Sequence, residues 1–382
     1  MSTIFFESFS SRLTSVYNKS LAEITPGLEE MAADSSTIIF NNYYNASTPT
    51  INGILAQLCS FLPPTGYTEI EVNKNLQRLR LLCLPEMLKK SGGYKSATYI
   101  TAVNKEFENK DAIFASMDTD SIYGQQELRS IISGEPLSWG YSDHQLFPAM
   151  WKLIQEKSPE PFLMMLSTVD THPPFDLAKD MIPYGDGKNN VFNSYHTADD
   201  AFGKWWQQFK ESKFYNNTIV VAVADHAAFP GADIKRLFSD GDTLSFYDKN
   251  MFMVYLPNGA LAKVNTPRYG LPKEVNTLAS SIDVIPTLLH VLNINVPNTL
   301  EGHSIFDNKS AYPNILGMHE YGLYINQEVD GSRKIDDQVP SQLNCKSADY
   351  SAVTSSALTP CEYLEFYNWK RQMFEQGRFW GK

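Results

Sequence analysis

Short apolar runs alternate with amphipathic segments along this chain. Runs rich in β-branched and aromatic residues, typical of buried strands, lie at 3–6, 37–40, 97–101, 162–169, 218–224 and 252–256. Segments with an apolar helical face lie at 51–61, 76–91, 144–157, 199–212 and 282–292. Strands that are apolar throughout and separated by helices predict an α/β fold, with a mostly parallel central sheet covered by helices on both faces.

The composition supports one large domain with a smaller appendage. Hydrophobic residues make up 43% of the 382 residues and charged residues 20%, which is enough apolar material for a large core. Residues 329–360 are polar and lack a periodic pattern. We therefore expect a main α/β domain at 1–310 and a C-terminal extension at 311–382 that packs against it.

The charge pattern narrows the classes of partner. The net charge is −11 and basic residues do not cluster, which argues against a nucleic-acid groove. No stretch approaches about 18 consecutive apolar residues, so we expect no membrane-spanning helix within the sequence. The N-terminus lacks a signal peptide and runs directly into the first predicted strand, which is typical of a piece of a longer protein.

Four cysteines form two pairs that are local in sequence: Cys59 with Cys83, and Cys345 with Cys361. None of the cysteines belongs to a CxxC or CxxH motif, so the sequence does not indicate a structural zinc site. An even count of this kind suits two disulfides in an oxidising compartment, and four buried free thiols are the alternative. Closing the first loop, of about 25 residues, stabilises by about 3.5 kcal/mol on the chain-entropy model.

Polar residues that can bind a divalent metal follow two of the predicted strands. Glu7 comes directly after Ile4-Phe5-Phe6, and Asp225 and His226 come directly after the run at 218–224. The carboxyl ends of parallel strands are where α/β sheets bind ligands. The plainer alternative for each residue is a structural role at a strand end. His172 follows a third strand, and Lys110 taken alone has the context of a surface lysine.

Two threonines flank a proline before the predicted helix at 51–61. In one interpretation Thr48 is the N-cap and Pro49 the first helical residue. In the other, a threonine hydroxyl at the helix N-terminus, where free N–H groups and the helix dipole favour an anion, is the nucleophile that a metal activates. The residues alone leave both interpretations open.

Several segments in this order resemble a known family. They are IFFES, TPTINGIL, VDTHPPF, VAVADH and SIDVIPTLLHVLNI followed by LEGHSIF, and they extend from Glu7 to Phe306. Together they resemble the sulfatase-like branch of the alkaline phosphatase superfamily. Within it, the closest resemblance is to the phosphoglycerol transferases, which include the lipoteichoic acid synthases and the transferases of periplasmic glucans. The WG-x-x-D element at 139–143 also fits, and the cysteine pair at 59 and 83 favours the periplasmic glucan type.

The resemblance implies a role for each matching residue. The metal ligands would be Glu7, Thr50, Asp225 and His226, with Thr50 also the nucleophile, so that Thr48 serves as the cap. The substrate-binding residues would be Lys110, His172 and Trp139. Glu108 departs from the pattern, because the lipoteichoic acid synthases have an aromatic residue there. The Asp-His pair also lacks the glycine that often follows it in relatives.

The function implied is transfer of phosphoglycerol from phosphatidylglycerol to a cell-envelope glycan or a polyglycerol phosphate, through a covalent phospho-threonine. One divalent metal is implied, Mn²⁺ first and Zn²⁺ or Mg²⁺ as alternatives. The location implied is the extracytoplasmic side of a bacterial inner membrane, with an N-terminal transmembrane region absent from this sequence. A phosphoethanolamine transferase shares the same core and remains the main alternative. A true sulfatase would need a C/S-x-P-x-R element, and a non-enzymatic glycan-binding module would be expected to lack a ligand.

Overall fold

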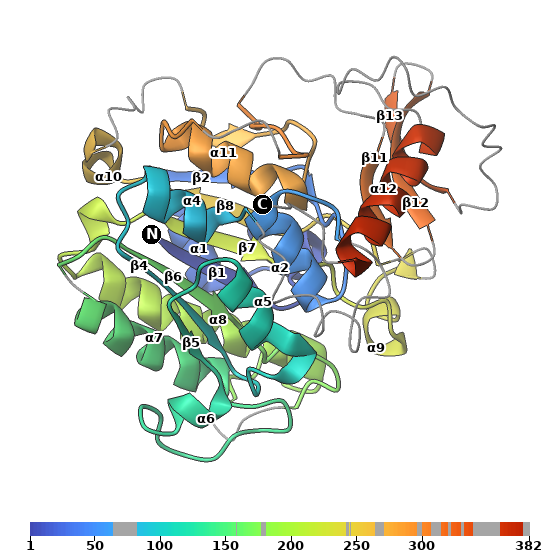
Figure 1. Cartoon of the computed structure of the whole chain (residues 1–382). Helices are drawn as coiled ribbons and strands as arrows, with labels where there is room; N and C mark the ends of the chain where they lie inside the picture. Colours follow the sequence, from blue (N-terminus) through green and yellow to red (C-terminus); the bar gives the residue numbers. More distant parts are fainter. Residues whose placement is uncertain are drawn as a thin grey trace.

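The computed structural model describes residues 1–63, 82–157, 159–176, 181–241, 244, 246–263, 271–295, 300–306, 315–319, 322–329, 332–338 and 360–376. An eight-stranded sheet lies at its centre, in the order β5-β4-β6-β1-β7-β8-β2-β9 (Figure 1). The strands are β1 Ser2–Phe6, β2 Thr37–Phe40, β4 Ser96–Thr101, β5 Ser121–Tyr123, β6 Phe162–Ser167, β7 Val220–Ala224, β8 Phe252–Tyr255 and β9 Glu274–Val275.

Strand β1 lies in the middle of this sheet, parallel to β6 on one side and to β7 on the other. Strand β8 is the exception, because it runs antiparallel to both of its neighbours, β7 and β2. The sheet is therefore mostly parallel, as predicted. The parallel pairing of β1 and β7 aligns Phe6 with Ala224, so the residues that follow these two strands begin at the same edge.

Helices cover both faces of the sheet (Figure 1). Their bounds are α1 Pro26–Ala33, α2 Thr50–Cys59, α4 Leu84–Ser91, α5 Lys110–Ser116, α6 Gln125–Leu128, α7 Asp143–Lys157, α8 Asn190–Lys210, α9 Ala232–Lys235, α10 Asn258–Lys263, α11 Val284–Val291 and α12 Pro360–Glu375. Because side chains alternate along a strand, Phe5 belongs to the core under α2, α4 and α11, whereas Ile4 and Phe6 belong to the core under α1, α7 and α8.

All six predicted strands are confirmed, at β1, β2, β4, β6, β7 and β8. The predicted helices correspond to α2, α4, α7, α8 and α11, with part of the predicted 76–91 helix outside the described residues. Helix α8 begins nine residues before its predicted start at 199, because the side chain of Asn189 caps it by accepting hydrogen bonds from the backbone N–H groups of Val191 and Phe192.

The C-terminal region has secondary structure of its own. A three-stranded antiparallel sheet contains β11 Ile315–His319, β12 Gly322–Val329 and β13 Ser332–Gln338, and it lies with α12 at one end of the molecule (Figure 1). Lys370 of α12 pairs with Glu301 at 2.5 Å, and the Tyr367 hydroxyl donates to the Pro63 carbonyl at 3.3 Å. The division at residue 310 stays a prediction. No helix in the described part of the chain is long and apolar enough to cross a bilayer.

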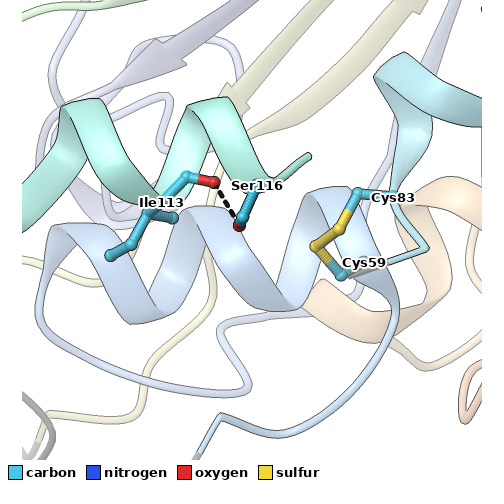
Figure 2. Close-up of a disulfide and its surroundings, with 4 residues drawn as sticks. All are labelled: Cys59, Cys83, Ile113 and Ser116. Carbon is cyan, nitrogen blue, oxygen red and sulfur yellow. Dashed lines mark hydrogen bonds between the residues drawn. A yellow bond between two sulfur atoms is a disulfide. The ribbon is translucent and has the colours of Figure 1, made fainter. Parts of the chain in front are cut away.

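A disulfide joins the end of α2 to the residue before α4. It links Cys59 with Cys83 across 24 residues of sequence, and Figure 2 shows it beside the helix that carries Ile113 and Ser116. This predicted pairing is confirmed. Cys345 lies outside the described residues, so the pairing of Cys345 with Cys361 stays a prediction.

Candidate active site

Three acidic and imidazole side chains meet at the carboxyl edge of the sheet. Glu7 directly follows β1, and Asp225 and His226 directly follow β7. Their ligand atoms all lie within 4.8 Å of one another, and the three residues are 4%, 1% and 0% exposed. The backbone N–H of Asp225 donates to the Phe6 carbonyl at 3.1 Å, which continues the β1–β7 pairing into the site. The predicted convergence of these strand ends is therefore present in the structure.

Helix α2 brings the hydroxyl of Thr50 to the same three residues. Thr50 Oγ1 donates to Glu7 Oε2 at 3.0 Å and lies 3.3 Å from His226 Nε2. The helix approaches the end of β7 closely, because a Cβ atom on Gly53 would lie 2.1 Å from the Asp225 carbonyl oxygen. Gln57 adds a hydrogen bond of 2.6 Å from its side-chain N–H to the Ala224 carbonyl. The packing of α2 against the end of β7 thus requires a glycine at position 53.

The predicted role of Thr48 as helix cap is wrong. Helix α2 begins at Thr50 with Pro49 in the cap position, and no side chain caps it. The first intrahelical bond runs from the N–H of Gly53 to the Pro49 carbonyl, and the Thr48 carbonyl instead accepts from the Asn52 side chain. Thr50 is therefore the first helical residue rather than the second, which places its hydroxyl at the positive end of the helix dipole.

Neighbouring groups fix the orientation of the cluster. Ser8 donates from its backbone N–H to Asp225 Oδ1 at 2.9 Å and from its hydroxyl to Glu7 Oε1 at 2.7 Å. His226 Nδ1 lies 2.8 Å from the Ala227 carbonyl, which assigns its proton to Nδ1. The unprotonated Nε2 then lies 3.7 Å from a Glu7 oxygen and 3.6 Å from an Asp225 oxygen.

The electrostatics of the cluster suit a bound cation. Burial, and then repulsion from Glu7, raise the pKa of Asp225 to about 7. Burial also acts to raise the pKa of Glu7, but the charges of His226 and His172 outweigh it and lower that pKa. Burial acts to lower the pKa of His226, but Asp225, Glu7 and more weakly Glu108 raise it overall. Two buried carboxylates, an imidazole nitrogen and a hydroxyl form a donor set that fits a divalent metal.

A cavity of about 80 Å³ adjoins Thr50. The predicted substrate residues Lys110, His172 and Trp139 all line it, together with Glu7 and Thr50. The centres of the Trp139 and His172 rings lie 4.2 Å apart, and the Trp139 indole N–H donates to the Pro173 carbonyl at 2.9 Å. His172 Nδ1 lies 2.6 Å from the same carbonyl oxygen. The structure therefore brings all of the predicted site residues to one place.

Lys110 is a buried residue, not the surface lysine that its local sequence indicates. It is 3% exposed, and its ammonium pairs with Glu108 Oε2 at 2.6 Å. Glu108 and Phe229 also line the cavity, and the sequence analysis assigned a role to neither of them. The signal available for Glu108 was its departure from the family pattern. Phe229, three residues after His226, lies in no periodic segment that would have marked it.

Asp143 of the WG-x-x-D element supports the loop that carries His172. Its two carboxylate oxygens accept from the backbone N–H groups of Val169 at 2.9 Å and Asp170 at 3.3 Å. In return Asp170 Oδ2 accepts from the N–H of Asp143 at 3.1 Å. Burial, and then the negative charge of Asp170, raise the pKa of Asp143 well above its usual value. The element therefore connects the start of α7 to the end of β6.

Comparison with known proteins agrees with this fold. The Sulfatase family model matches residues 3–294. Phosphoglycerol transferase I of Escherichia fergusonii is 25% identical over 232 residues, which cover 58% of this chain and 30% of that protein. The homologue from an Escherichia coli strain is 26% identical over the same length. The chain thus spans less than a third of the length of these curated relatives.

Solved structures show the same fold at low sequence identity. An alkaline phosphatase superfamily protein from Vibrio parahaemolyticus has a TM-score of 0.71 at 18% identity, covering 100% of this chain and 88% of that one. The lipoteichoic acid synthase LtaP from Listeria monocytogenes has a TM-score of 0.68 at 19% identity, covering 99% and 90%. The family resemblance inferred from the sequence is confirmed: the chain belongs to the Sulfatase family and has the fold of the alkaline phosphatase superfamily.

Proposed function

We propose that this chain is the catalytic domain of a metal-dependent phosphotransferase that moves phosphoglycerol from phosphatidylglycerol to an envelope glycan or a polyglycerol phosphate. The observation that carries the proposal is the position of the Thr50 hydroxyl, 3.0 Å from Glu7 and 3.3 Å from His226, at the wall of a cavity. The curated relatives named phosphoglycerol transferase I support the choice of group transferred.

Glu7, Thr50, Asp225 and His226 would hold the metal, with Mn²⁺ expected first and Zn²⁺ or Mg²⁺ as alternatives. A divalent cation there supplies positive charge that favours the alkoxide of Thr50 and offsets charge on the phosphate. The neighbouring Glu7 carboxylate accepts the hydrogen bond of the Thr50 hydroxyl, so it would take up the proton that leaves when Oγ1 attacks.

The reaction would proceed in two displacements at phosphorus. Thr50 Oγ1 forms a bond to the head-group phosphorus, and the bond to the diacylglycerol oxygen breaks as that oxygen takes up a proton. The oxygen of an acceptor hydroxyl then bonds to this phosphorus as the bond from phosphorus to Thr50 Oγ1 breaks, and the proton that the acceptor loses restores the Thr50 hydroxyl. Lys110 and His172 would bind the phosphate oxygens, and Trp139, whose ring contacts the His172 ring at a tilt of 52°, would help to hold that ring in place.

Because the donor is a membrane lipid, the domain would be tethered near a bilayer. We also propose that it lies outside the cytoplasm. A disulfide between Cys59 and Cys83 suits such an oxidising compartment. One solved neighbour, at a TM-score of 0.58 and 17% identity, is the periplasmic domain of EptC from Escherichia coli. A second candidate activity is phosphoethanolamine transfer. The carboxylate of Glu108 in the cavity favours it, because a carboxylate can pair with an ammonium.

The test is donor turnover and capture of the covalent intermediate. We expect the Mn²⁺-loaded protein to release diacylglycerol from phosphatidylglycerol and to carry one phosphoglycerol on Thr50, located by peptide mass spectrometry. Thr50→Ala should abolish both, whereas Thr50→Ser should retain some of each because it keeps the hydroxyl. In a separate calorimetric titration, Asp225→Ala should weaken Mn²⁺ binding. Full turnover by Thr50→Ala would refute the proposal.

A further inference from the structure

In the cavity beside Thr50, Lys110 and Glu108 form an ion pair with each other in the absence of a substrate. Lys110 Nζ lies 2.6 Å from Glu108 Oε2, 3.5 Å from the Phe107 carbonyl and 4.8 Å from the centre of the Phe107 ring. The side chains of Lys110 and Glu108 are only 4% and 14% exposed. The lysine expected to bind phosphate therefore has its charge balanced by a carboxylate in the same cavity.

The backbone holds Glu108 in a conformation that most residues avoid. Its φ is 54° and its ψ is 25°, and the next residue, Asn109, has a φ of 54° and a ψ of 30°. This left-handed region suits glycine or asparagine, and a glutamate there costs free energy. Such strain collects at functional sites, where the side chain it presents serves a purpose. Here the strained residue presents a carboxylate to the cavity.

A phosphate that binds Lys110 changes the partners of Glu108. The phosphodiester and the carboxylate would then compete for one ammonium, and two negative groups beside it repel each other. A mostly buried carboxylate also requires hydrogen-bond donors in place of those it gives up. Three aromatic residues, Phe107, Trp139 and Phe229, form part of the cavity wall, and hydroxyl residues that include Thr50 and Thr101 form another part. A polar group on the substrate can enter the cavity and supply the missing hydrogen-bond donor to Glu108.

We propose that Glu108 selects the lipid head group by accepting a hydrogen bond from a polar group at the far end of that head group. This polar group is a hydroxyl in a glycerol head group and an ammonium in an ethanolamine head group. Lys110 binds the phosphate, and Glu108 binds the polar end of the alcohol attached to it. This inference rests on the proposed transfer function and names the residue that determines its specificity.

The test compares three lipids that differ only in the head group: phosphatidylglycerol, phosphatidylethanolamine and phosphatidylpropanol, which has no terminal donor. Diacylglycerol release reports kcat/KM for all three. We expect the wild type to favour a lipid with a donor over phosphatidylpropanol by about 10-fold or more, the effect of one hydrogen bond to a charged group. Glu108→Ala should reduce this ratio to about 1, within roughly twofold. The ratio cancels any change in how Lys110 binds the phosphate, because that change affects the three lipids equally.

Two further variants separate selection from structure. Glu108→Gly removes the carboxylate and relieves the backbone strain, so it should lose the selectivity while unfolding less readily than Glu108→Ala, which leaves the same Lys110 ammonium unpaired but keeps a Cβ atom in the left-handed region. Glu108→Gln distinguishes the two donors: its amide oxygen still accepts from a hydroxyl but cannot balance an ammonium. The control is Glu127→Gln, because Glu127 forms a similar pair with Lys105 at 2.6 Å outside the cavity; its ratio should stay at the wild-type value.

The outcomes distinguish this inference from the function on which it rests. A wild-type protein that releases diacylglycerol from none of the lipids refutes the proposed transfer and the inference with it. A wild type that turns over all three lipids equally well refutes only the role of Glu108. Selectivity that persists in both Glu108→Ala and Glu108→Gly also refutes the role of Glu108. Loss of selectivity in both variants, with turnover of phosphatidylpropanol retained, supports that role.

Discussion

Replacing Lys110 by alanine should separate the two functions of this buried cation. Its ammonium is positioned to bind the donor phosphate, and it also balances the charge of Glu108 at 2.6 Å. Loss of a charge-assisted hydrogen bond costs about 1.5–3 kcal/mol of transition-state binding, so kcat/KM should fall roughly 10- to 100-fold. Lys110→Arg keeps the charge and should recover part of this loss.

The same substitution should also destabilise the fold. Removing one partner of a fully buried pair costs about 3–5 kcal/mol. The Glu108 side chain keeps 14% of its exposure and so retains some hydration, and we therefore expect a smaller loss, of about 1–3 kcal/mol in the free energy of unfolding. The double variant Glu108→Gln, Lys110→Ala leaves no unpaired charge. It should recover most of that stability and none of the phosphate binding.

Urea unfolding and donor kinetics on the same preparations provide the two readouts. Lys105→Ala is the matched control, because Lys105 pairs with Glu127 at 2.6 Å but is 28% exposed and lies outside the cavity. An exposed pair of this kind contributes about 0–1 kcal/mol, and its loss should leave kcat/KM unchanged. Wild-type kcat/KM in Lys110→Ala would show that the ammonium does not bind the donor.

Three more changes have defined outcomes. Thr48→Ala should lower the free energy of unfolding by about 1 kcal/mol, the ordinary cost of a substitution at a buried position, and leave turnover intact, because Thr48 caps no helix; a fall in kcat/KM would contradict this. Removing the Cys59–Cys83 disulfide with a double Ala variant should lower that free energy by about 3.5 kcal/mol, measured by urea unfolding without reductant. Asp143→Asn should cost about 1–2 kcal/mol and lower kcat/KM, because an amide cannot accept from both backbone N–H groups; wild-type kcat/KM would exclude an effect on the loop of His172.

The meeting of Glu7 and Asp225, two of the proposed metal ligands, could be predicted because the positions of these two residues follow from the sheet. A parallel strand places the residue after its last apolar position at the carboxyl edge, and two adjacent strands in register place two such residues together. Glu7 and Asp225 satisfy this rule, since Phe6 pairs with Ala224. The strands β5 and β9 and the helix α6 are among the elements that the sequence pattern missed, because runs of only two to four residues carry little periodicity.

The burial of Lys110 could not be predicted from its neighbours. The segment Phe107-Glu108-Asn109-Lys110 contains three polar residues and reads as an exposed turn. The cavity that encloses the ammonium also has walls from Trp139 and His172, which come from loops tens of residues away in sequence. Local polarity therefore predicts the wrong environment for Lys110, and only the family resemblance indicates the phosphate-binding role proposed for it.

The start of helix α2 shows how tertiary packing overrides local capping preference. Thr48 and Thr50 are equally good cap residues by type, and a proline between them favours placing the cap at Thr48. In the structure the backbone of Pro49 is extended, with a φ of −75° and a ψ of −161°, so Pro49 lies outside the helix and Thr50 is the first helical residue. One turn later, Gly53 packs against the Asp225 carbonyl with no room for a Cβ atom, which holds this end of α2 against the end of β7. The start at Thr50 and the close approach at Gly53 together place the Thr50 hydroxyl 3.0 Å from Glu7.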